Sequence, residues 1–404
     1  MQKSKRFFIT CILILSFFVS LSCQAQPADK TTSPRLGVWI TVFSPEEVLY
    51  STESIDRLIE TCKSTGVNDI YIQVYRAGKA YYDSDIADST PYKKMVASCG
   101  RDPVKYLIRK ATMNDISLHA WINVLSVSQN KNADIIKKLG KGVITVDQHG
   151  RSAFADKNPD DLDGYYIREK QIFLEPGDKR VRDYFGSITE ELIKKYPRLA
   201  GLHLDYIRYP RVVPFVPGSR FNSHGISYGY GEKNVSSFKA KTGLDVKKMG
   251  NSRENFQKWD NWRREQVTAT VRELSEKARG LAPSLKISCT IIASADMTYL
   301  TTFQDWTLWI KEGYINYVVA MDYTDDPRLF DINALSLMMP DVKDKVQIGV
   351  GAYLLKDRPE LFREELEISA KIDPPGIVIF SYDDIAADKQ IRDAVIDVLG
   401  PAKD

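Results

Sequence analysis

The chain has 404 residues and a formal net charge of +3 at pH 7, with 56 basic and 53 acidic residues. Acidic and basic residues are interspersed, without the basic patch of a nucleic-acid-binding protein, so nucleic acid is excluded as a partner. No repeat period and no long Gly/Ser-rich linker divides the chain, so we expect one large domain with a single core.

The first 25 residues have the layout of a secretory signal peptide. Basic residues precede an apolar run that ends in small and polar residues at 20–26, and this run is shorter than the roughly 20 apolar residues of a transmembrane helix. Cys23 has two interpretations: the lipid-bearing first residue of a mature lipoprotein, which we favour, or part of an ordinary cleavage site after Ala25. We expect an exported protein, secreted or held in the cell envelope (outer membrane or periplasm), with 26–34 as a linker and a lipid anchor as its contact with membranes.

From residue 35 to 400, short apolar, β-branched runs alternate with longer helical patterns, which is typical of βαβ units with a parallel sheet. The eight expected strands are 36–42, 67–75, 116–124, 200–206, 285–292, 314–322, 345–351 and 376–382. Helices are expected at about 51–65, 101–114, 178–195, 254–281, 303–312, 331–339, 359–371 and 386–398. Eight such pairs predict an α/β fold, a (β/α)8 TIM barrel.

Two connections are longer than such a barrel needs. The segment 125–177 follows the third strand, and 208–253, rich in Gly, Pro, Ser and Tyr, follows the fourth. Both leave the carboxyl ends of strands, where barrel enzymes build their active sites. We therefore expect these two loops to wall a substrate cleft.

Polar side chains occupy strand ends where a purely structural interior would carry Val, Ile and Leu. Because side chains alternate between the two faces of a strand, residues two apart point the same way. The inward sets that result are Gly37, Trp39 and Thr41; Tyr71, Gln73 and Tyr75; His119, Trp121 and Asn123; His203 and Asp205; Ala320 and Asp322; and Ser381 and Asp383.

Asp205 is the strongest candidate for catalysis. A carboxylate at the inward end of a strand is unfavourable to bury without partners, so it indicates either chemistry or a hydrogen-bonded structural role. Arg208 follows three residues later in GLHLDYIRYP and would hold Asp205 ionised, as a nucleophile requires. The alternative is that the two residues form only a buried ion pair.

Glycoside cleavage needs a second carboxyl group, an acid with a raised pKa. Asp322 at the end of the sixth strand is the best candidate, since Met321 and Tyr323 give it apolar surroundings. Asp296 and Asp383 are alternative acids, and loop capping or substrate binding is the other interpretation of all three. In a retaining enzyme the two carboxyl groups should lie about 5–6 Å apart.

Aromatic residues gather where a sugar would lie, because flat rings with polar edges suit the CH faces of pyranose rings. Those expected to bind substrate are Trp39, Trp121, Trp306, Tyr209 and Tyr323, with core packing as the alternative for each. His119 and His203 lie in mid-strand without a second ligand at metal spacing, and 156–166 lacks the EF-hand pattern. We expect neither a metal nor a cofactor.

Several motifs in order resemble the glycosyl-hydrolase-like family ten of bacterial envelope proteins, over about residues 35–390. They are RLGVWIT, VNDIYIQVYRAGKAYYDS, LHAWINV, LEPGDKRVRDY, GLHLDYIRYP, WDNWRREQV and QDWTLWIKEGYINYVVAMDY. The resemblance implies a barrel related to those of α-galactosidases and amylases, with Asp205 on the fourth strand as nucleophile and Asp322 on the sixth as acid. The resemblance also implies that the substrate subsites are formed by Gln73, Arg76, Trp121, Asn123, Arg208 and Tyr209.

The chain departs from that family at two positions expected to touch the cleft. QVYRAGKAYY stands where the family has QVRPxGDAxY, with Lys79 in place of an acid, and Glu175 occupies a place commonly Asn or Asp. Substrate preference is therefore not implied by the resemblance, although some members resemble peptidoglycan glycan-strand hydrolases.

The sequence predicts a retaining glycoside hydrolase that acts on a polysaccharide or a peptidoglycan glycan by double displacement. Two alternatives stay open. One is a non-catalytic glycan-binding envelope lipoprotein, and the other is a polysaccharide deacetylase, which would need a metal.

Overall fold

The computed structural model describes residues 34–154, 169–211, 225–249 and 252–400. The expected signal peptide with Cys23 and nearly all of the expected linker lie outside the described residues. Within the described ranges, no helix combines the length and the apolar character needed to cross a bilayer.

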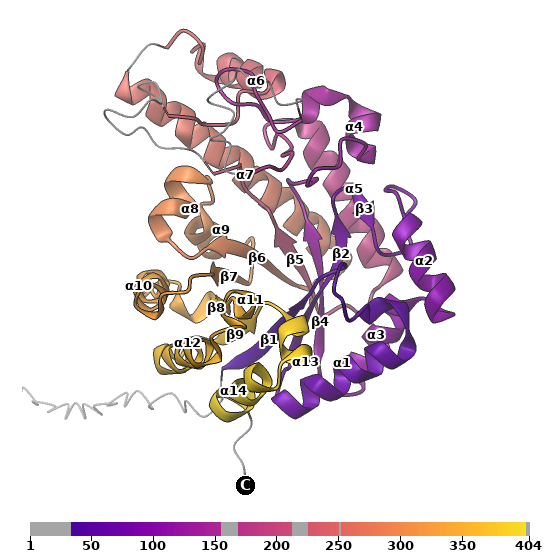
Figure 1. Ribbon diagram of the computed structural model, residues 1–404. Coiled ribbons are helices and arrows are strands. Elements are labelled where there is room, and N and C mark those ends of the chain that lie inside the picture. Colours follow the sequence, from indigo (N-terminus) through magenta and orange to yellow (C-terminus); the bar gives the residue numbers. More distant parts are fainter. Residues whose placement is uncertain (1–33, 155–168, 212–224, 250–251, 401–404) are drawn as a thin grey trace, which may run out of the picture. The chain divides into compact units, whose positions relative to one another are not determined.

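Eight parallel strands close into a barrel (Figure 1). In chain order they are β1 (Arg35–Ile40), β2 (Asp69–Arg76), β4 (Ser117–Asn123), β5 (Gly201–Asp205), β6 (Lys286–Ile292), β7 (Tyr317–Asp322), β8 (Val346–Val350) and β9 (Gly376–Ile379). β1 pairs with both β2 and β9, which closes the sheet, and β3 (Lys79–Ala80) is a short antiparallel extension of β2. The α/β class and the (β/α)8 barrel are therefore confirmed.

Helices surround the barrel (Figure 1). They are α1 (Thr52–Thr65), α2 (Thr90–Cys99), α3 (Pro103–Thr112), α4 (Asp134–Leu139), α5 (Lys179–Lys195), α6 (Glu232–Thr242), α7 (Arg253–Leu281), α8 (Ala295–Thr301), α9 (Trp306–Lys311), α10 (Pro327–Leu337), α11 (Ala352–Leu355), α12 (Pro359–Ile372), α13 (Tyr382–Ala387) and α14 (Lys389–Leu399). The sequence did not predict α2, α4, α6, α8, α11 and α13 as helices. The segment 208–253, expected as a loop, contains the whole of α6.

Capping residues set many of the helix boundaries. The side chain of Ser51 accepts a hydrogen bond from the backbone N–H of Ser54 at the start of α1, which ends at Gly66 with a φ of 78°. The side chains of Asp178, Asp305 and Asp326 accept backbone N–H groups in the same way at the starts of α5, α9 and α10. Several aspartates of the chain therefore serve helix starts.

Aromatic and polar side chains fill the inside of the barrel. Trp39 and Tyr71 pack together there with Trp121, Val319 and Val378. The indole N–H of Trp39 donates to Nε2 of His203 at 3.2 Å. Burial holds the pKa of His203 well below its usual value, so this imidazole stays neutral and accepts that hydrogen bond.

A β-bulge breaks the alternation of side chains near the carboxyl end of β2. The register of β2 against β4 shifts between Gln73 and Tyr75. Tyr75 consequently packs against Phe185 of α5, with 5.7 Å between ring centroids. The expectation that Tyr75 shares the inward face with Gln73 is therefore wrong.

The two long connections are joined to each other beside the barrel. α6 and the first turns of α7 extend past the strands (Figure 1), and Asp147 pairs with Tyr228 in a β-bridge. The buried carboxyl group of Glu175 accepts hydrogen bonds from the hydroxyls of Tyr209 at 2.6 Å and Thr145 at 2.8 Å. Glu175 thus fastens one loop to the other.

Candidate functional site

A cavity of about 610 Å³ opens at the carboxyl ends of the strands. Its lining comes from most of the barrel strands and the segments that follow them. The residues are Phe43, Gln73, Arg76, Trp121, Asn123, Ser128, Asp205, Tyr206, Arg208, Arg211, Thr290, Ile292, Ala293, Ser294, Met297, Met321, Asp322, Tyr323, Leu329, Asn333, Tyr353 and Phe380. Asp205 and Asp322 both belong to this lining, at the end of the barrel where active sites are built. The expectation that Asp322 shares the inward face with Ala320 is wrong, because Val319 and Met321 of β7 pack into the barrel interior.

Asp205 is 5% exposed, and three donors hold its carboxyl group. Thr290 donates to Oδ1 at 2.6 Å, the backbone N–H of Tyr206 to the same oxygen at 2.7 Å, and the indole of Trp121 to Oδ2 at 3.0 Å. Burial raises the pKa of Asp205, while these donors and the charge of Arg208 act against that rise. The carboxyl group is thereby fixed in orientation, with its anionic form supported by hydrogen bonds.

Arg208 has a different partner from the one the sequence suggested. Its guanidinium donates to both carboxylate oxygens of Glu169, at 3.0 and 2.9 Å, and to the backbone carbonyl of Tyr209. Its effect on Asp205 is one of charge at a distance. The support expected of Arg208 comes mainly from Thr290 and the backbone of Tyr206, and the alternative of a simple Asp205–Arg208 ion pair is wrong.

Asp322, at the end of β7, is 2% exposed and poor in donors. The amide of Asn333 on α10 donates to Oδ1 at 2.9 Å, whereas Oδ2 has no hydrogen-bond partner among the described residues. Burial raises the pKa of Asp322 to about 7, and only the hydrogen bond from Asn333 acts against it. A carboxyl group of this kind is protonated for a substantial part of the time at neutral pH.

A second buried carboxyl group lies behind Asp322. Glu365 on α12 is 0% exposed, and neither of its oxygens has a hydrogen-bond partner among the described residues. Burial raises its pKa to about 9, and the charge of Asp322 adds to that rise. A negative charge on Asp322 therefore disfavours ionisation of Glu365.

Six residues predicted to bind substrate are brought together around the two carboxyl groups. They are Gln73, Arg76, Trp121, Asn123, Arg208 and Tyr323. The amide of Gln73 donates to Asn123 at 3.0 Å across β2 and β4. These six side chains give the cavity the mixture of aromatic faces and hydrogen-bonding groups that a sugar requires.

Three residues expected to contact substrate are not among the cavity's lining. Trp39 lies inside the barrel on His203, Tyr209 is buried with its hydroxyl on Glu175, and Trp306 is a buried core residue at the start of α9. For these three, the structure favours the core-packing interpretation. Alternation along a strand gives the direction of a side chain but not its depth.

The alternative acids and the two departures from the family also lie outside the lining of the cavity. Asp296 is exposed in the first turn of α8, and Asp383 accepts a hydrogen bond from Ser44 in the first turn of α13. Lys79 is 3.8 Å from Asp88 in an ion pair, and Glu175 fastens the two long loops. The expectation that Lys79 and Glu175 touch the cleft is therefore wrong.

Several lining residues escaped the sequence analysis. Thr290 follows the alternation rule on β6 and was open to prediction, because it lies two residues after the buried Ser288. Phe43 comes from a connecting segment, whereas Tyr353 and Asn333 come from the helices α11 and α10. No local sequence pattern marks a helix residue that reaches a strand end, so Asn333 carried no signal.

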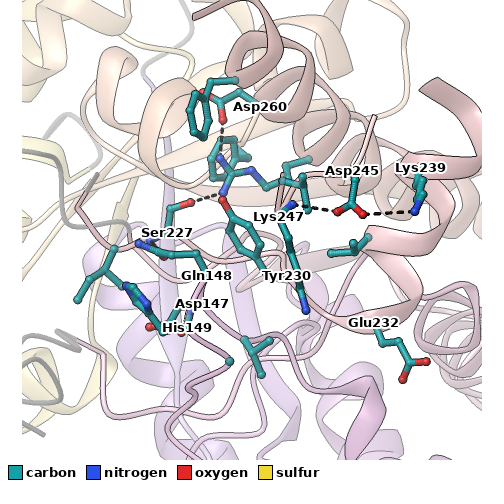
Figure 2. A pocket seen from close by; sticks show the side chains of 18 of the residues that line it. Asp147, Gln148, His149, Ser227, Tyr230, Glu232, Lys239, Asp245, Lys247 and Asp260 are labelled. Carbon is teal, nitrogen blue, oxygen red and sulfur yellow. Dashed lines mark hydrogen bonds and ion pairs between the residues drawn. The ribbon is translucent and has the colours of Figure 1, made fainter. Parts of the chain in front are cut away.

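Figure 2 shows a larger cavity of about 1260 Å³ beside α6 and the start of α7. Charged groups at its wall pair with one another, as Lys239 does with Asp245 at 3.3 Å and Arg263 with Asp260. Its lining includes no strand residue. The smaller cavity is therefore the candidate active site. In the described part of the chain, no three His, Cys, Asp or Glu side chains gather as a metal-binding group.

The family model described as Glycosyl hydrolase-like 10 matches residues 35–347. Glycosyl hydrolase YngK of Bacillus subtilis (strain 168) is 22% identical over 423 residues, covering 95% of this chain and 74% of that protein. Glycosyl hydrolase DigH of Escherichia coli (strain K12) is 21% identical over 442 residues, covering 96% of this chain and 90% of that protein.

Among solved structures, the glycoside hydrolase domain of PgaB (BpsB) from Bordetella bronchiseptica is similar, with a TM-score of 0.63 at 13% identity. The match covers 92% of this chain and 100% of that domain, and it shows the fold alone. The family match and the named relatives indicate a glycan-related function. Because the family model spans most of the barrel, this chain belongs to the Glycosyl hydrolase-like 10 family.

Proposed function

We propose that this protein is a retaining glycoside hydrolase that cleaves a polysaccharide or a peptidoglycan glycan with Asp205 and Asp322. One observation carries the proposal: a single cavity at the strand ends holds two carboxyl groups with opposite surroundings. Asp205 is held by three donors, whereas Asp322 has one donor and a pKa of about 7. Such a division assigns acid and nucleophile in glycosidases.

In the first step, Asp205 attacks the anomeric carbon and forms a glycosyl ester. The C–O bond to the leaving sugar breaks, and its oxygen takes the proton of Asp322. In the second step, Asp322, now a carboxylate, removes a proton from water, and that water cleaves the ester and restores Asp205. Donors on both oxygens of Asp205 keep the carboxylate oriented for attack without neutralising it.

Asp322 suits the acid role because its pKa lies near neutral pH, where a group can both give and take a proton. Its Oδ2 has no hydrogen-bond partner among the described residues, so no donor there stabilises the carboxylate form. The aromatic side chains of Phe43, Tyr323 and Tyr353 at the cavity wall offer faces for pyranose rings.

The test is turnover of a glycan panel and of aryl glycosides by the wild type and three variants. Asp205→Asn should lose turnover of every substrate, since no glycosyl ester can form. Asp322→Asn should spare aryl glycosides, whose leaving groups need little proton assistance. Asp296→Asn, an exposed carboxylate outside the cavity, is the matched control and should behave as the wild type.

Two further measurements fix the mechanism. Azide should rescue Asp205→Gly and give a glycosyl azide of inverted configuration, and NMR should show that the wild-type product retains configuration. Activity of Asp205→Asn on activated substrates, with Asp322→Asn inactive, would reverse the assigned roles. Binding of glycans without turnover by the wild type would instead support the non-catalytic alternative.

Export is part of the same proposal. A glycan-cleaving enzyme with an amino-terminal signal peptide would meet its substrate outside the cytoplasm, either secreted after cleavage at Ala25 or held in the envelope through a mature amino terminus at Cys23. Mass determination of the mature amino terminus separates the two processing alternatives, since lipidation at Cys23 adds acyl chains and cleavage after Ala25 does not.

A further inference from the structure

The β-bulge in β2 aims an arginine at the candidate active site. On a regular strand Gln73 and Tyr75 would share one face, but the register shift sends Tyr75 outward onto Phe185. Gln73 and Arg76 both line the cavity as a result. Bulges commonly re-aim a side chain next to an active site, and here the re-aimed side chain is a cation.

The guanidinium of Arg76 lies over the aromatic ring of Phe43, which is exposed at the wall of the cavity. The Cζ atom of Arg76 is 4.2 Å from the ring centroid of Phe43, and Phe43 is 58% exposed. The segment that carries Phe43 is fixed to β2, because the backbone N–H of Val42 donates to Oε1 of Gln73 at 3.4 Å. A guanidinium stacked by its face keeps its N–H donors at the edge, where they can bind a ligand.

The charges of the cavity leave Arg76 without a carboxylate of its own. Arg208 and Arg211 share Glu169, at 2.9 and 3.8 Å, whereas no carboxylate of the described residues forms an ion pair with Arg76. Of the two carboxyl groups in the lining, Asp205 is occupied by its donors. Asp322 resists ionisation, because burial raises its pKa to about 7.

We propose that Arg76, stacked on Phe43, forms a subsite for an anionic substituent of the glycan, a carboxylate or a sulfate ester. This inference rests on the proposed function and narrows its substrate to acidic glycans. The fork of N–H groups of an arginine suits the paired oxygens of both substituents, and the bond is charge-assisted. The aromatic ring of Phe43 keeps the guanidinium in place before the substrate arrives.

The experiment measures binding and turnover of matched pairs of oligosaccharides. One pair consists of uronic-acid oligosaccharides and their carboxyl-reduced forms, and the other of sulfated oligosaccharides and their desulfated forms, each in α and β linkages. The proteins are the wild type, Arg76→Gln, Arg76→Lys and a control, Arg101→Gln. Arg101 lies 5.3 Å from the ring of Tyr106 in a similar stacked arrangement, outside the cavity lining.

The wild type should bind the anionic member of one pair at least about ten-fold more tightly than its neutral partner, as one charge-assisted hydrogen bond allows. That preference should fall as salt rises, because Arg76 is only partly buried. Arg76→Gln should abolish the preference while changing the affinity for the neutral partner by less than about two-fold. Arg76→Lys should keep part of it, and Arg101→Gln all of it.

Two outcomes would overturn the proposal. One is the absence of any difference between the members of both pairs. The other is an equal loss of affinity for both members in Arg76→Gln. That result would mean that Arg76 maintains the shape of the cavity but does not discriminate between charged and neutral ligands. The pair that responds to Arg76→Gln identifies the substituent as carboxylate or sulfate.

Failure of this inference and failure of the proposed function are distinguishable. Turnover that depends on Asp205 but is equal for the anionic and neutral members of both pairs would refute the acidic subsite and leave the hydrolase. A binding preference that depends on Arg76, without turnover by the wild type, would leave the subsite and refute the hydrolase.

Discussion

Neutralising Asp322 should stabilise the protein at alkaline pH. Burial raises the pKa of Asp322 from 3.8 to about 7, because its carboxylate has a single donor, Asn333, and an unpartnered Oδ2. Between these two pKa values the folded protein keeps a proton that the unfolded chain has released. Asn at position 322 carries no such proton and keeps an oxygen for the hydrogen bond from Asn333.

The sign and the magnitude follow from proton linkage. Where the folded state binds more protons than the unfolded state, the free energy of unfolding falls as pH rises, by about 1.4 kcal/mol per pH unit for one group. Over roughly three units the loss is about 4 kcal/mol, absent below about pH 4 and complete above about pH 7. Asp322→Asn should therefore exceed the wild type in unfolding free energy by up to about 4 kcal/mol at about pH 8.5.

Urea denaturation of both proteins at about pH 4 and about pH 8.5 measures this difference. The exposed Asp296 supplies the control, since Asp296→Asn should follow the wild type at both pH values. Asp322→Asn and the wild type should have nearly equal free energies of unfolding at the acidic pH and different ones at the alkaline pH. A difference between Asp322→Asn and the wild type that is the same at both pH values would refute the burial argument.

Three other perturbations test separate contacts. Asn333→Ala removes the donor that lowers the pKa of Asp322, so the alkaline limb of kcat/KM should move to higher pH, and a move to lower pH would contradict that hydrogen bond. Glu169→Ala leaves Arg208 buried without its carboxylate, so urea denaturation should show a loss of about 3–5 kcal/mol, whereas a change below about 0.5 kcal/mol would show that water replaces the partner. Cys23→Ala should move the protein from the membrane fraction to the soluble fraction, and an unchanged distribution would exclude a lipid anchor.

The barrel was predictable because its signals are local. Eight β-branched runs between helical patterns gave the strand order, and the strand ends lie within three residues of the expected ones. The short elements were missed for a physical reason. α6 is fixed by packing of Phe238 against Trp259, with 4.9 Å between ring centroids, and such a contact between distant residues leaves no periodic pattern.

The site was predictable as far as strand alternation reaches. The rule placed Gln73, Trp121, Asn123 and Asp205 on the inward face, and all four line one cavity. Asp322 also belongs to that lining, although the inward face of β7 carries Val319 and Met321. The alternation rule failed where a β-bulge changed the direction of a side chain, or where a side chain lay too deep in the barrel to reach the cavity. The bulge in β2 turned Tyr75 away from the face that Gln73 occupies. Partners that come from helices and distant loops had no signal, because only the closed fold brings them near a strand end.

Asp205 and Asp322 stand at the carboxyl ends of β5 and β7 but on opposite faces of the sheet, and their neighbours differ accordingly. The donors that support a carboxylate at Asp205 come largely from adjacent strands, Trp121 on β4 and Thr290 on β6. Asp322 receives one donor from α10 and faces a second donor-poor carboxyl group, Glu365. The lack of donors that keeps the proton on Asp322 at neutral pH also lowers the stability of the fold when that proton leaves. The acid role proposed for Asp322 and its destabilising effect are therefore one physical property, and a variant that recovers the stability must give up the acid.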